Sequence, residues 1–103
     1  MSLEIMASGN LVIDPMDRSN RGAPYIAFTV VADVNTEGGR EPMWIDVAVT
    51  GQLMLRAAKL KKGDGVWVRG RVTKRRYRHR DEERESFQMD VNELITANET
   101  YSA

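Results

Sequence analysis

Hydrophobic and polar residues alternate along most of the chain, which is the period of a β-strand rather than of a helix. The clearest case is residues 43–50, where every second residue from Met43 to Val49 is apolar and should face a core. Comparable patterns predict four further strands, at residues 4–13, 25–34, 66–77 and 85–96. In the last of these, a slip in register is expected near Asn92 and Glu93, so that Leu94 or Ile95 points inward.

Turn signals separate the predicted strands. Gly9 inside the first strand predicts a bulge or a sharp bend. Residues 17–24 are predicted to form a loop, and residues 35–42 a flexible connection around Gly38-Gly39. The three successive acids within residues 80–84 indicate another turn, and residues 98–103 are expected to be a frayed end.

Only residues 52–62 favour a helix, with Leu53, Ala57 and Leu60 on one face and Gly63 as the terminating residue. Three strands, a short helix and two more strands is the element order of an all-β OB-fold, a five-stranded Greek-key barrel with one short helix between strands 3 and 4. The chain of 103 residues is the length of one such domain, spanning residues 1–103 with a core of about 4–97.

Charge is balanced overall, with 15 basic and 15 acidic residues, but it is unevenly distributed. Between Arg56 and Arg84 there are twelve Lys or Arg residues and four acids. A basic segment of this kind attracts a polyanion within about 8 to 10 Å, even when the net charge is zero.

The strongest functional signal lies within this segment, from Trp67 to Arg80, where cations and rings occur without a carboxylate. Its candidate contacts are Trp67, Arg69, Arg71, Lys74, Arg75, Arg76, Tyr77, Arg78 and Arg80, with His79 as a weaker one. Cations that follow phosphates and rings that stack on bases are what binding of a single strand requires. The alternative is a solvated hairpin whose charges protect a sheet edge. The first half should form barrel wall, and residues 74–80 a mobile basic arm.

The two tryptophans leave alternatives open. Trp44 lies opposite the apolar row of its strand and is a second candidate for base stacking, although a lid over the barrel or a subunit contact would also use it. Trp67 fits a nucleic-acid contact and an oligomer interface equally well.

The sequence gives little support for catalysis or for a metal site. The chain has no cysteine and a single histidine, His79, so neither a thiolate site, a histidine-based metal site nor a catalytic triad is expected. The acids Asp81, Glu82, Glu83 and Glu85 are typical of a solvated turn rather than a metal cluster, and neither a metal nor a cofactor is expected. No apolar run is long enough to span a membrane, so an intracellular protein is expected.

The same residues resemble bacterial single-stranded DNA-binding proteins. The resemblance covers about residues 4–97 and rests on an ordered series of motifs: Gly9-Asn10-Leu11, Asp14-Pro15, Phe28-Thr29-Val30, Trp44 with Val47, Gly51-Gln52-Leu53, Leu60-Lys61-Lys62-Gly63-Asp64 and Val66-Trp67-Val68-Arg69-Gly70-Arg71. It implies an OB-fold that assembles as a homotetramer, or a dimer, and coats single-stranded DNA in replication, recombination and repair. The implied location is the bacterial cytoplasm, associated with the nucleoid, and no cofactor is implied.

By position, Trp44 and Tyr77 resemble the family's stacking rings. Lys62, Arg71, Lys74 and Arg75 fall where the family places cations that contact phosphates. Thr50 stands where a stacking Phe is frequent, and Asp46 where a basic residue is common, which implies weaker or more salt-sensitive binding. The family's long tail with an acidic tip is missing from this sequence, which puts the recruitment of repair proteins in doubt.

Three hypotheses follow. The first is a sequence-tolerant protein that binds single-stranded DNA, and the second is an OB-fold adaptor of a primosome-like assembly that acts through protein contacts. The third is an RNA-binding OB domain, since stacking alone does not distinguish RNA from DNA. An enzyme is the least expected, because no nucleophile, base and orienting group occur at a recognisable spacing.

Overall fold

The computed structural model describes residues 3–96, except for the side chains of residues 34–36. The order of its elements is β1 (Leu3–Leu11), β2 (Met16–Asn20), β3 (Ala23–Thr36), β4 (Gly39–Val49), the 3-10 helix η1 (Gly51–Leu53), α1 (Met54–Ala57), β5 (Gly65–His79) and β6 (Glu82–Thr96). The end predicted to fray, residues 98–103, lies outside the described residues. None of the described helices is long and apolar enough to cross a membrane.

Five of the strands close into a barrel. The sheet order is β1-β5-β6-β4-β3-β2, and β1 also pairs with β3 through Asn10 with Val31 and Leu11 with Val30. All pairings are antiparallel except that of β4 with β6, which is parallel. The helical segment lies between β4 and β5, the third and fourth barrel strands. This confirms the predicted OB-fold, with β2 as a sixth strand outside the barrel.

Most of the barrel core consists of strand residues whose alternation predicted burial, and Ala57 and Leu60 of the helical segment complete it. Buried side chains include Phe28, Ile45, Val47, Val66 and Met89, each at most 2% exposed. The predicted slip in β6 is also present: Arg69 pairs with Glu93 but Gly70 pairs with Val91, so Asn92 is an extra residue in the ladder. Because of this bulge Leu94 is buried, whereas Ile95 is 38% exposed.

Gly9 has a different role from the predicted bulge. The pairing of β1 with β5 runs past Gly9 without a shift in register. A Cβ at this position would lie 2.1 Å from the carbonyl oxygen of Val31. Glycine is therefore required where β1 crosses close to β3 and the barrel closes.

The helix is shorter than predicted. It ends at Ala57, and Lys59 and Leu60 then donate their backbone N–H groups to the carbonyls three residues before them. The N–H groups of Lys61 and Lys62 bond to the carboxylates of Asp64 and Asp14 instead of to helix carbonyls. This turn carries Leu60 into the core, and Gly63, with φ +94, ends the turn rather than the helix.

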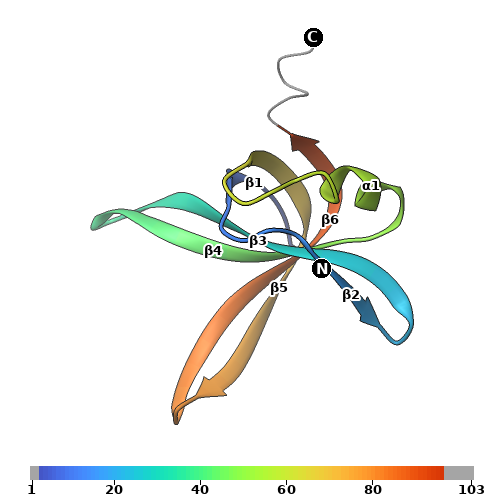
Figure 1. The fold of residues 1–103 in the computed structure, drawn as a ribbon. Helices are drawn as coiled ribbons and strands as arrows, with labels where there is room; N and C mark the ends of the chain where they lie inside the picture. The colour runs from blue at the N-terminus through green and yellow to red at the C-terminus, as the bar shows by residue number, and fades with distance from the viewer. Residues whose placement is uncertain (1–2, 97–103) are drawn as a thin grey trace.

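Three two-stranded ribbons project from the barrel (Figure 1). Residues 17–24, predicted as a loop, instead form most of the β2/β3 hairpin, which turns at Arg21-Gly22 with φ values of 52 and 83. Residues 35–42, predicted as a flexible connection, lie mostly in β3 and β4. The β5/β6 hairpin turns at Arg80-Asp81, so residues 82–84 are strand rather than turn.

Candidate nucleic-acid interface

Exposed rings from β4 and β5 lie on one outer face of the barrel. Trp44 precedes the inward-facing Ile45 and is 56% exposed, as its parity predicted. Ile45 pairs with Phe87 of β6, and the preceding residue of β6, Ser86, pairs with Arg75 of β5. Trp44 and Arg75 are therefore two strands apart, about 10 Å at the usual strand spacing, at the same level of the sheet.

Tyr77 follows Arg75 on the same side of β5 and is 47% exposed. From β4 to the end of β5, this outer side carries a ring, a cation and a second ring in succession. We call it the ring face, and its members are Trp44, Arg75 and Tyr77, joined by Arg18 and Tyr25 described next. The structure thus brings together Trp44 and Tyr77, the two residues that were predicted to stack on bases.

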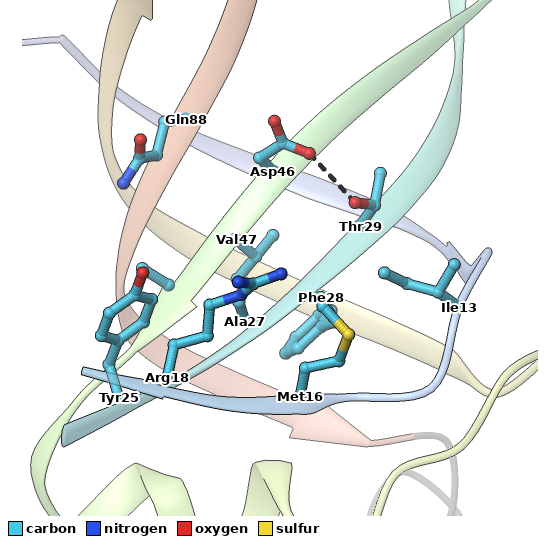
Figure 2. A pocket seen from close by; sticks show the side chains of 11 residues that line it. Ile13, Met16, Arg18, Tyr25, Ala27, Phe28, Thr29, Asp46, Val47 and Gln88 are labelled. Carbon is cyan, nitrogen blue, oxygen red and sulfur yellow. Dashed lines mark hydrogen bonds between the residues drawn. The ribbon is translucent and has the colours of Figure 1, made fainter. Parts of the chain in front are cut away.

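The β2/β3 hairpin extends the ring face with two hollows. The first, of about 270 Å³, is bordered by Arg18 and Met16 of β2 and by Tyr25 of β3, while Asp46 and Gln88 stand at its other side (Figure 2). The second, of about 400 Å³, shares Tyr25 and Gln88 with the first and is lined by Arg75 as well. The ring face is therefore a grooved surface that leads from β2 to β5.

The segment predicted as a mobile basic arm is a paired hairpin. Within residues 3–96, β5 pairs with β1 as far as Val72 and then continues against β6 as far as the pair of His79 with Glu82. We call residues 73–88 the arm. Figure 1 shows it projecting from the barrel as a ribbon. Successive residues of the arm point to opposite sides, so its cations are divided between two faces.

One side of the arm carries its cations next to acids. Lys74 and Arg76 both form ion pairs with Glu85, at 3.1 and 3.6 Å, and Arg78 lies opposite Glu83. On the other side, which continues the ring face, Arg75 lies opposite Ser86 and Tyr77 lies opposite Arg84. Among the described residues Arg75 has no ion pair within 4.0 Å, and Arg84 pairs only with the exposed Glu82, at 3.6 Å. The ring side is therefore the better placed to meet phosphates.

The arginines of the barrel wall also have acidic neighbours. Arg69 lies 3.7 Å from Glu93 of β6, and Arg71 lies between Glu4 of β1 and Asp90 of β6. The run from Trp67 to Arg80 contains no carboxylate in sequence, yet pairing with β1 and β6 places several alongside it. Each of these exposed pairs contributes little to stability, but they lower the local positive potential.

Trp67 and Lys62 lie apart from the ring face. Trp67 is 50% exposed and pairs with Ser8 on one side and Ile95 on the other, near the start of β5. Lys62 precedes β5 and is held by the bond from its backbone N–H to Asp14, at 2.8 Å. Tyr77 lies twelve residues beyond Gly65, which is about 40 Å along an extended strand. The predicted site residues therefore do not form a single cluster.

Three residues of this surface were not predicted from the sequence. Arg18 and Tyr25 border the hollows, but the loop predicted for residues 17–24 concealed their common face. Asn20 and Gly22, which are residue types that favour tight turns, were the signal for a turn there. Arg84 was assigned to a turn, so its position opposite Tyr77 was not foreseen. Within residues 3–96 no group of His, Cys, Asp or Glu is arranged to hold a metal ion.

A five-stranded barrel closed by β1, with rings and cations on one grooved outer side, defines an OB-fold protein. The chain matches the model of the single-strand binding protein family over residues 3–96, and it belongs to that family. A comparison with curated protein sequences gave no match.

Two solved structures are similar to the chain over nearly its whole length. One is the small single-stranded DNA-binding protein from Streptomyces coelicolor, which is 25% identical with a TM-score of 0.76; the match covers 92% of this chain and 94% of that chain. The other is the Plasmodium falciparum SSB in complex with ssDNA, which is 17% identical with a TM-score of 0.69, over 93% of this chain and 94% of that one. At 17% identity the second likeness shows the fold alone.

Proposed function

We propose that this protein binds single-stranded DNA with little dependence on sequence, in replication, recombination or repair, and catalyses no reaction. The observation that carries the proposal is the ring face, where Trp44 and Tyr77 are half exposed on one side of the barrel with Arg75 between them. Bases stack on exposed rings regardless of their identity, and cations between the rings meet the phosphates. Membership of the family and the likeness to the small single-stranded DNA-binding protein from Streptomyces coelicolor support it.

A titration with oligo-dT at several salt concentrations tests the proposal. Stacking on Trp44 should quench tryptophan emission, and the affinity should fall as salt rises, because bound phosphates release counterions. Unchanged emission with no salt-dependent binding would refute it. Competition between matched DNA and RNA oligomers would show which nucleic acid the ring face prefers.

The two sides of the arm should differ in their contribution. Replacing Arg75 with alanine is expected to lower the affinity for oligo-dT and to reduce the slope of log affinity against log salt by about 0.7, the value for one lost phosphate contact on a single strand. Arg76 is its matched control, since it is the next residue but lies on the opposite side and pairs with Glu85. Salt titrations of both alanine variants measure this difference, and equal effects would contradict the assignment of the ring side.

We further propose that the protein is a homo-oligomer, a dimer or a tetramer, whose contact includes Trp67. Trp67, Met6 and Ile95 are exposed side chains on three neighbouring strands. Among residues 3–96, most of β1 pairs with β5 alone, which leaves its other edge without a partner in this part of the chain. Exposed apolar patches and open strand edges favour association. The same patch supports the alternative function, an adaptor of a primosome-like assembly.

Replacing Trp67 with glutamate should therefore lower the oligomeric state, because a charge on this patch would have to be buried in the contact. Light scattering coupled to size-exclusion chromatography measures the molar mass. Ser19, exposed on β2 and outside the patch, is the control position for the same substitution. An unchanged molar mass for Trp67→Glu would exclude this contact between subunits. If the variant keeps its molar mass but no longer binds another protein that the unmodified chain binds, the adaptor function is favoured.

A further inference from the structure

The first hollow of the ring face exists because two small side chains pair across its floor. Ala27 of β3 lies opposite Ala48 of β4, and both line the hollow. Met16 and Arg18 of β2 lie opposite Ala27 and Tyr25 and rise beside this floor (Figure 2). The resulting space of about 270 Å³ is close to the lower limit of ligand pockets, roughly 300 Å³, and is open to a strand lying on the ring face.

A carboxylate stands at the rim of this hollow. Asp46 points outward from β4, and the hydroxyl of Thr29 donates to its Oδ1 at 3.0 Å, which orients the carboxylate (Figure 2). Its parallel partner on β6, Gln88, lines the same hollow. Within the described part of the chain Asp46 forms no ion pair. Its second oxygen is therefore available to accept hydrogen bonds from a molecule in the hollow.

A carboxylate on a surface that binds DNA repels the phosphates of the strand. It can interact favourably with the strand only by accepting a hydrogen bond from a base. An ionised carboxylate only accepts hydrogen bonds. The exocyclic amino groups of cytosine, adenine and guanine donate, and Asp is a known acceptor for the N4 amino group of cytosine. Uracil and thymine present a carbonyl oxygen in place of that amino group, and their one donor on this edge, the N3–H, lies between two carbonyl oxygens that repel a carboxylate.

We propose that this hollow holds one nucleobase of the bound strand and that Asp46 selects a base with an exocyclic amino group over uracil or thymine. The inference rests on the proposed binding of single-stranded DNA and adds a preference at one position of an otherwise tolerant surface. Arg18 supplies a planar guanidinium at the side of the hollow, where it can stack on the base or meet its phosphate.

Oligo-dC and oligo-dU of equal length test the preference, because cytosine and uracil differ only at the N3 and C4 positions of the edge that Asp46 would contact. The unmodified protein should bind oligo-dC about fivefold more tightly, within the range of one discriminating base contact. Asp46→Asn should bring this ratio close to one, since an amide presents a donor as well as an acceptor. Because the variant also loses a negative charge, its affinity for oligo-dU should rise.

Asp33→Asn is the matched control. Asp33 lies on the same side of β3 as Thr29, is exposed and lines neither of the two hollows described, so its loss changes the charge of the surface without changing the hollow. The Asp33→Asn variant should bind both oligomers more tightly and keep the ratio of the two affinities unchanged. Equal binding of oligo-dC and oligo-dU by the unmodified protein, or a preference that survives Asp46→Asn, would overturn this inference alone. Failure to bind either oligomer would overturn the proposed function with it.

Discussion

Replacing Trp44 with alanine should weaken the binding of oligo-dT by about tenfold to a hundredfold, because each stacked base contributes about 1 to 3 kcal/mol. Tyr77→Ala should have a similar but smaller effect, since a phenol ring offers less stacking area than an indole. Both rings are half exposed on the ring face, so their removal leaves no cavity in the core. Fluorescence anisotropy of labelled oligo-dT measures the affinity of variants that have lost a tryptophan.

The control for these variants is Leu55→Ala, which removes an exposed apolar side chain from α1, away from the ring face. Its affinity should be unchanged. The Trp44→Ala and Tyr77→Ala variants should also keep the thermal stability of the unmodified protein. If Trp44→Ala binds oligo-dT as tightly as the unmodified protein does, the ring face is not the DNA-binding surface, and the adaptor function is favoured.

Gly70→Ala should destabilise the protein by about 3 kcal/mol, in the range of severe core substitutions. Gly70 lies beside the bulge at Asn92, and a Cβ there would lie 2.0 Å from the carbonyl oxygen of Asp90 and 2.9 Å from the Cα of Val91. Both neighbours are backbone atoms in the barrel wall, so they cannot give way as a flexible side chain would. Thermal unfolding followed by circular dichroism should show a midpoint lower by roughly 15 °C.

Gly22→Asn is the comparison for this prediction. Gly22 has φ +83 at the tip of the β2/β3 hairpin, and a Cβ there would meet no atom within 4 Å. Asparagine tolerates this conformation better than other residues with side chains, so the midpoint should change by only a few degrees. A Gly70→Ala variant as stable as Gly22→Asn would show that the barrel wall can open at the bulge.

Much of the fold follows from local patterns. Alternation in residues 43–50 predicted that Ile45, Val47 and Val49 are buried and that Trp44 is exposed, and the structure confirms both. The slip near Asn92 was visible because the inward parity of β6 changes there. Such predictions succeed because strand geometry ties the orientation of a side chain to its position in the sequence, whatever the strand pairs with.

The predictions that were wrong, those for β2 and for the end of the helix, failed because the structure there depends on residues far away in the sequence. All of β2 is exposed, so it has no alternating pattern, and only its antiparallel pairing with β3 makes it a strand. The helix was predicted to run to Lys62, but Asp14, 48 residues away in sequence, bonds to the backbone N–H of that residue. Neither interaction is visible within a window of a few residues.

The alternation of residues along the chain sets which side of each barrel strand faces the core, and it shows where the cations and rings occur. Strand pairing sets which of these side chains lie next to one another. Register places Glu85 beside Lys74 and Arg76 while leaving Arg75 opposite Ser86, so neighbouring cations in one basic run have different surroundings. This difference arises because electrostatic and stacking interactions depend on distance in space, and in a barrel these distances are set by strands far apart in sequence.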